Sequence, residues 1–200
     1  SPQMLKAYAW RMKYREILNP DSLYAGLKGL EQWVKQTDQP MDRAILHSLI
    51  AGIYANYAAN NQWQLRQRTE IVGQMPSADI REWTANMFVE KVRTNVKEAL
   101  ADSVLLLKTS SRDYIPFVEL GKTSEYYHHD FYHLLASRGI DALLQVEKLS
   151  GGYAETNAVN PVKQDIIAIY ENMLSAYKAA GLKEGYVLTA LNYMEWRRGA

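Results

Sequence analysis

The fold is decided by residues 42–69, which read DRAILHSLIAGIYANYAANNQWQLRQRT. At helical spacing the bulky apolar side chains fall on one broad arc, while alanine, serine and glycine fill most of the other side. No formal charge occurs between Arg43 and Arg66. A helix without a charged face is covered by protein on most sides, and small residues allow a neighbouring helix to approach closely. The stretch is therefore predicted to be the central helix of an all-α domain.

The segments before this stretch also carry helical patterns. Apolar residues at positions 23, 27, 30 and 34 predict an amphipathic helix that residues 37–40, TDQP, bring to an end. Residues 1–17 carry apolar stripes on two faces, so this first helix needs packing partners on both sides.

Further helices are expected in the second half of the chain. Asp79, with Glu82 three residues later, resembles a capping box that starts a long helix, with a break near residues 101–102. Residues 126–146 are predicted to be helical again. No stretch with a period of two rivals these signals, which together predict an all-α fold of stacked antiparallel helices, a tetratricopeptide-like or α-solenoid-like array.

The domain organisation is predicted from the same patterns. Residues 1–146 form a helical core domain, and residues 147–161, EKLSGGYAETNAVNP, form a linker or loop. Residues 162–200 form a C-terminal helical hairpin that packs on the same array, with Gly181 ending its first helix.

The composition excludes several classes of function. A net charge of +1 gives no electrostatic footprint for nucleic acid. The absence of cysteine excludes disulfides, thiolate catalysis and cysteine-ligated metals. Residues 44–65 are uncharged, but His47 and several asparagines and glutamines in them argue against a membrane span. Because the chain starts at Ser1, it is expected to be a piece or a processed form of something longer.

One local pattern raises the question of a metal. His129 and His133 can share a helix face at the spacing that binds zinc in metalloproteases. The usual glutamate between them is replaced by Asp130, whose shorter side chain reaches poorly as a general base, and a third ligand would have to be Asp141 or His128. The alternative is the polar start of a helix. We therefore predict no metal, no cofactor and no enzymatic activity, and keep a metal-dependent hydrolase only as a distant alternative.

The other candidate sites point to packing or to protein binding. His47 lies between the bulky and small arcs and is predicted to be a packed histidine satisfied by a backbone carbonyl or a tyrosine. Aromatic residues near both ends of the chain are candidates for an interaction surface. They are Tyr8, Trp10 and Tyr14 near the N-terminus, and Tyr186, Tyr193 and Trp196 near the C-terminus. The alternative is that these rings fill seams between helices, or face other parts of a larger protein.

Several blocks carry a resemblance to a known family. They are SPQMLKAYAWRMKY at 1–14, AILHSLIAGIYANYAANNQW at 44–63, the Asp79-Ile80-x-x-Trp83 helix start, YHLLASRGID at 132–141 and the helix through 191–196. In this order they resemble the helical N-terminal region of large bacterial α2-macroglobulin-like proteins, exported relatives of protease-trapping proteins. The thioester of that family needs a cysteine, so it would lie outside this chain, and the connection at 147–161 is shorter than the family leads us to expect.

The resemblance implies a non-enzymatic scaffold or protein-interaction domain of a protease-inhibitor-type protein. Its partners would be other domains of the same larger protein and a protein or peptide. Its location would be extracytoplasmic, in the periplasm or at the outer membrane. The alternative that the residues themselves support is a free-standing helical-repeat module that binds a peptide or a partner protein.

Overall fold

The computed structural model describes residues 3, 4, 6–8, 10, 11, 22–69, 77, 79–115, 118, 130–150 and 160–199. The regular structure of these residues is helical, and their one β-type contact is an isolated antiparallel bridge between Ser110 and Asp130. The prediction of an all-α protein is thus confirmed. The elements are α2 Ser22–Gln36, α3 Pro40–Asn60, α4 Gln62–Arg66, the 3-10 turn η1 Ile80–Glu82, α5 Ala85–Ala99, α6 Ser103–Lys108, the 3-10 turn η2 Ser111–Tyr114, α7 Phe131–Glu147, α8 Pro161–Ala180 and α9 Lys183–Gly199.

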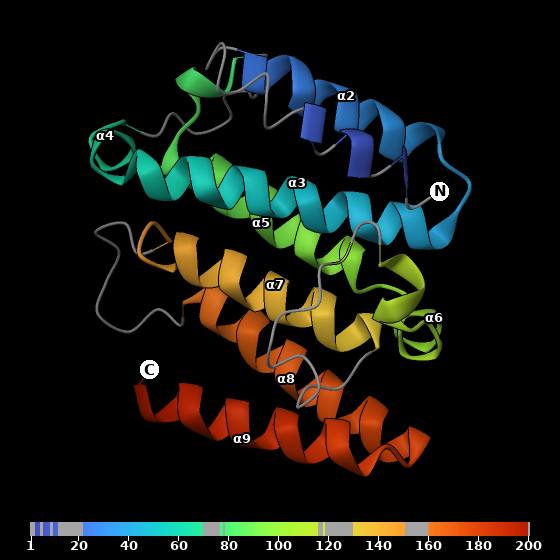
Figure 1. Ribbon diagram of the computed structural model, residues 1–200. Helices are drawn as coiled ribbons and strands as arrows, with labels where there is room; N and C mark the ends of the chain where they lie inside the picture. The colour runs from blue at the N-terminus through green and yellow to red at the C-terminus, as the bar shows by residue number, and fades with distance from the viewer. Residues whose placement is uncertain are drawn as a thin grey trace.

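Helix α3 lies at the centre, as its lack of a charged face predicts. It packs against α2, α5 and α7, with α2 on one side and α7 on the other (Figure 1). Both arcs are buried, the bulky one through Ile45 and Leu46 and the small one through Ala51 and Ala55. The helix ends at Asn60, and the short helix α4 follows it, as the two asparagines at 60 and 61 predict.

Aromatic rings join α3 to α5. The Phe88 ring lies 5.2 Å from that of Tyr57 and 5.4 Å from that of Trp83, and Trp83 stacks on Tyr54 at 5.3 Å between centroids. The Trp83 indole nitrogen donates to the carbonyl of Ser77 at 2.7 Å, which satisfies its one donor inside the cluster. This cluster holds the start of α5 against the C-terminal half of α3.

The long helix predicted to start at Asp79 is present, but it starts six residues later, at Ala85. The Asp79 carboxylate accepts from the Arg81 backbone N–H at 2.9 Å, and this forms only the short turn η1. Trp83 and Thr84 are then extended, so α5 begins at Ala85. The physical reason is that Trp83 turns into the core, where it is buried, before the helix can start.

Helix α7 also begins later than predicted. Asp130 has an extended backbone, with φ −82° and ψ 158°, and its carboxylate accepts from the His133 N–H at 2.6 Å. It is therefore an N-cap, and the helix starts at Phe131 rather than at residue 126. Residues 126–129 lie outside the described residues. The predicted break after α5 is confirmed, because Asp102 caps the separate helix α6 by accepting from the Leu105 N–H.

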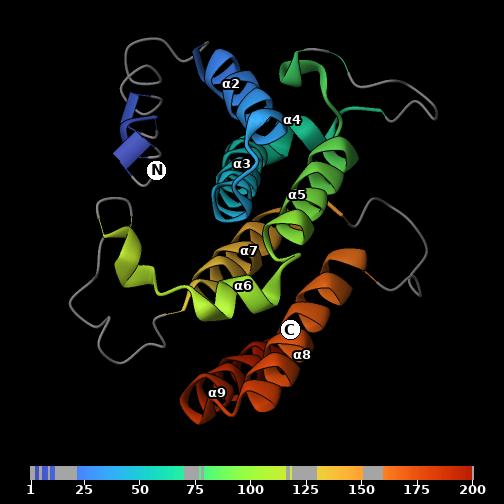
Figure 2. The ribbon, with the colours of Figure 1, turned by 90° about the vertical axis from the view of Figure 1, so that its right-hand side faces the viewer.

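Helices α8 and α9 lie side by side at the end of the stack opposite α2 (Figures 1 and 2). Asn160 caps α8, whose first residue is Pro161, and Gly181 ends it at φ 69°, as predicted. Gly185 lets α9 approach closely, since a Cβ there would lie 2.6 Å from Cε1 of Tyr177.

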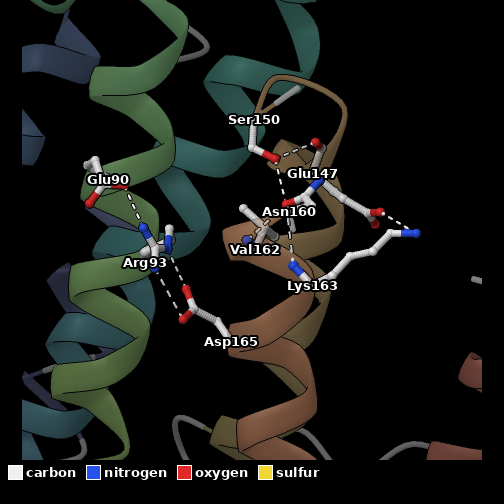
Figure 3. Close-up of polar contacts among 8 residues, drawn as sticks. All are labelled: Glu90, Arg93, Glu147, Ser150, Asn160, Val162, Lys163 and Asp165. Atoms are coloured by element: carbon white, nitrogen blue, oxygen red, sulfur yellow. Dashed lines mark hydrogen bonds and ion pairs between the residues drawn. The ribbon is translucent and has the colours of Figure 1, made fainter. Parts of the chain in front are cut away.

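Side chains tie this hairpin to the rest of the molecule. The Ser150 hydroxyl, just after α7, lies 2.8 Å from the Asn160 side-chain oxygen that caps α8 (Figure 3). Lys163 of α8 pairs with Glu147 of α7 at 3.5 Å. The predicted boundary at residue 146 thus falls at the end of α7, and the one at residue 162 falls at the start of α8. The division into a core and a hairpin stays a prediction.

Candidate functional site

A groove runs between α2, α3 and α5, with a volume of about 580 Å³. Buried Ile50 and Trp83 and the half-buried Val34 and Met87 give it an apolar floor. Its polar members are Glu31, Lys35, His47, Asn86, Glu90, Lys91, Thr94 and Asn95. An apolar floor with a few placed polar groups is the usual build of a binding site. We call this feature the α2–α3–α5 groove.

A charged pair stands on its rim. Lys91 Nζ lies 3.2 Å from Glu31 Oε1 and 5.8 Å from the ring centroids of Tyr54 and Trp83. The same Glu31 oxygen accepts from the Tyr54 hydroxyl at 2.9 Å. Because both side chains of the ion pair keep about a third of their surface exposed, the pair contributes little to stability and its charges remain accessible to a ligand.

His47 contributes a polar group to the groove. Its Nδ1 lies 2.8 Å from Oδ1 of Asn95, whose amide nitrogen donates to the carbonyl of Lys91 at 2.8 Å. Since the Asn95 oxygen faces the ring, Nδ1–H is the donor of this contact. The prediction of a packed, satisfied histidine is confirmed, but its expected partner, a carbonyl or a tyrosine, was wrong. The partner was missed because no pattern near His47 indicates an asparagine that lies 48 residues away in the sequence and on another helix.

A second hollow, of about 510 Å³, lies between α5, α7 and α8. Arg93 lines it, and its guanidinium bonds Asp165 of α8 through two nitrogens and Glu90 of α5 at 2.6 Å through the third (Figure 3). Asp165 is the main cause that raises the pKa of Arg93 above its ordinary value. Because the arginine is already engaged by carboxylates from two helices, this hollow is better understood as a tie between α5 and α8 than as a ligand site.

Comparisons with known proteins do not identify a family for this chain. A scan against protein-family models and searches of curated proteins and of solved structures found no match. None of the described helices is long and apolar enough to cross a membrane.

The aromatic residues proposed from the sequence have different surroundings where the structure describes them. The Tyr8 hydroxyl donates to the carbonyl of Gly26 at 3.1 Å and its ring lies 5.4 Å from that of Trp33, so it fills a seam beside α2. Trp10 is 41% exposed, and Tyr14 lies outside the described residues. At the other end of the stack, three rings pack together: Tyr193 stacks on Tyr170 at 4.9 Å with Trp196 beside both, whereas Tyr186 is 39% exposed.

Of the predicted histidine pair, the structure describes only His133. His133 is buried in the first turn of α7, while His128 and His129 lie outside the described part of the chain. Among the residues that the structure does describe, no three histidine or acidic side chains gather as a metal site requires. The hypothesis of a metal at His129 and His133 therefore stays untested.

Tyr54, which hydrogen-bonds Glu31 beside the groove, predicts that stability falls at alkaline pH. Burial first, and then the neighbouring Glu31 carboxylate, raise the pKa of Tyr54 far above its ordinary value. A raised folded-state pKa leaves stability intact below the unfolded pKa of about 10 and removes it as the pH rises further, at about 1.4 kcal/mol per pH unit. Urea unfolding from about pH 8 to about pH 11, on either side of that unfolded pKa, should show this fall. In Tyr54→Phe the free energy of unfolding should fall less steeply, by up to about 1.4 kcal/mol per pH unit. An unchanged slope in Tyr54→Phe would contradict the assignment.

Proposed function

We propose that this chain is a non-enzymatic helical scaffold that binds a protein partner through the α2–α3–α5 groove. The observation that carries the proposal is the groove itself, with Ile50, Trp83 and Met87 below and the Glu31–Lys91 pair on the rim. An amphipathic helix laid into an apolar groove needs this arrangement: its apolar face covers the floor, and its polar edge meets the rim. Charges of both signs on the rim favour a partner with mixed rather than uniform charge.

A solenoid-like, tetratricopeptide-like arrangement is part of the same proposal. What supports it is the order of contacts, in which α2 packs on α3, α3 on α7, α7 on α8 and α8 on α9, with α5 along α3 and α7. Both views have these helices in that order along the stack (Figures 1 and 2). Arrays of this kind present extended surfaces to partners.

Membership in a larger α2-macroglobulin-like, protease-inhibitor-type protein is a proposal that rests on the order of the sequence blocks alone. It implies an extracytoplasmic location and contacts with other domains of the same protein. The full reading frame tests it: β-rich domains and a thioester cysteine downstream would support it, and a reading frame without them would favour a free-standing binding module.

The groove is tested by selecting ligands from a displayed library of peptides. We expect selected peptides to carry apolar residues at helical spacing, and Met87→Glu to weaken their binding at least about tenfold, since it puts a charge on the floor. Val104→Glu is the matched control, because Val104 is 59% exposed on α6, away from the groove.

Circular dichroism and thermal unfolding would establish that both variants remain folded. Peptides that bind Met87→Glu and the unaltered chain equally well would rule out the groove as their site. A library that yields no ligand at all would count against the proposed function.

A further inference from the structure

Helix α9 packs on α8 with one face and exposes large apolar side chains on the opposite face. Its inner face, with buried Gly185 and Thr189, packs on α8. Its outer face carries Val187, Leu191 and Met194, which are 54%, 58% and 56% exposed. These three follow one another at spacings of four and three, so they form one straight row on the side away from α8. Large apolar side chains exposed in a row, rather than singly, mark an interaction surface.

The row is flanked by opposite charges. Glu184 and Arg198 are both exposed, and each lies seven residues from Leu191, so both continue the same row. When a second copy of the helix is placed alongside in the opposite direction with Leu191 on the two-fold axis, Glu184 of each copy falls opposite Arg198 of the other. The parallel arrangement instead sets glutamate against glutamate and arginine against arginine. The row is therefore complementary to itself in the antiparallel direction only.

We propose that α9 pairs with α9 of a second copy of this chain in an antiparallel, two-fold-symmetric dimer centred on Leu191. The position of α9 permits this, because it lies at the edge of the stack (Figures 1 and 2), and its outer row is open among the described residues. The interface consists of one helix pair with three apolar residues a copy. It is small, and the dimer forms at micromolar rather than nanomolar concentrations.

Sedimentation of the whole 200-residue chain over a range of concentrations tests the dimer. We expect reversible association that Leu191→Asp abolishes. Glu184→Arg and Arg198→Glu should each weaken it about tenfold, because each turns two attractive contacts into two repulsive ones. An equimolar mixture of these two variants should associate again, since every contact between them is then a Glu–Arg pair.

Control variants distinguish this interface from association through another face of the molecule. Lys178→Glu makes the same charge change as Arg198→Glu in the last turn of α8, off the outer row, and should leave association unchanged. A chain that stays monomeric at every concentration would overturn the proposal, as would a dimer that tolerates Leu191→Asp. Variants that weaken association but do not restore it when mixed would overturn the antiparallel register.

Discussion

Replacing Phe88 with alanine is expected to lower the free energy of unfolding by about 3–5 kcal/mol. Phe88 is fully buried where α3 meets α5, and three other rings, those of Tyr54, Tyr57 and Trp83, surround it. Removing it costs the transfer free energy of the ring and leaves a cavity that these large neighbours cannot fill without leaving their own positions. Urea or thermal unfolding followed by circular dichroism measures the loss.

Two variants control this measurement. Phe88→Leu keeps much of the volume and should cost about 1.5 kcal/mol or less. Val104→Ala, at an exposed position on α6, should change stability by no more than about 0.5 kcal/mol. If Phe88→Ala were as mild as the Val104 variant, the aromatic cluster would not hold α5 against α3.

Replacing Asp130 with alanine is expected to cost roughly 2–4 kcal/mol. Its buried carboxylate caps α7 through the His133 N–H and accepts from the Tyr177 hydroxyl of α8 at 3.0 Å. The substitution removes the cap and deprives the fully buried phenol of this acceptor. Burial first, and then the Asp130 charge, raise the pKa of Tyr177 above its ordinary value, so the phenol keeps the proton that it donates to the carboxylate.

A double-mutant cycle separates the two roles. Asp130→Asn keeps an acceptor oxygen for the cap and should lose less than half as much stability as Asp130→Ala. Tyr177→Phe, alone and combined with Asp130→Ala, measures the coupling between α7 and α8 through this contact. Additive effects in that cycle would mean that Asp130 acts only as a cap.

Sequence patterns predicted those elements whose signals are local. The uncharged stretch after Arg43 marked α3 as central, because a helix with no polar face needs neighbours all round. Gly181 marked the end of α8, since it acts through its own backbone geometry, whereas Pro161, assigned to the linker, is the first residue of the helix. The ends of such elements follow from the residues that form them.

Predictions were wrong or missing where contacts between residues far apart in the sequence decide the local structure. Asp79 has the composition of a helix start, but burial of Trp83 in the ring cluster keeps the next residues extended. The groove was missed altogether, since its polar pairs join Glu31 to Lys91 and His47 to Asn95 across three helices. No spacing rule links such residues, and only the packing of the helices brings them together.

The order in which the helices contact one another also determines which part of the molecule unfolds first. Arrays built from neighbour contacts gain stability unit by unit, and their ends unfold locally while their centre is intact. Helix α9 packs chiefly on α8, so it can detach at the lowest cost, whereas α3, enclosed by α2, α5 and α7, separates only when the whole molecule unfolds. Stability therefore falls along the array from α3 toward α9, and any partner that covers the outer row of α9 slows opening at its weakest end.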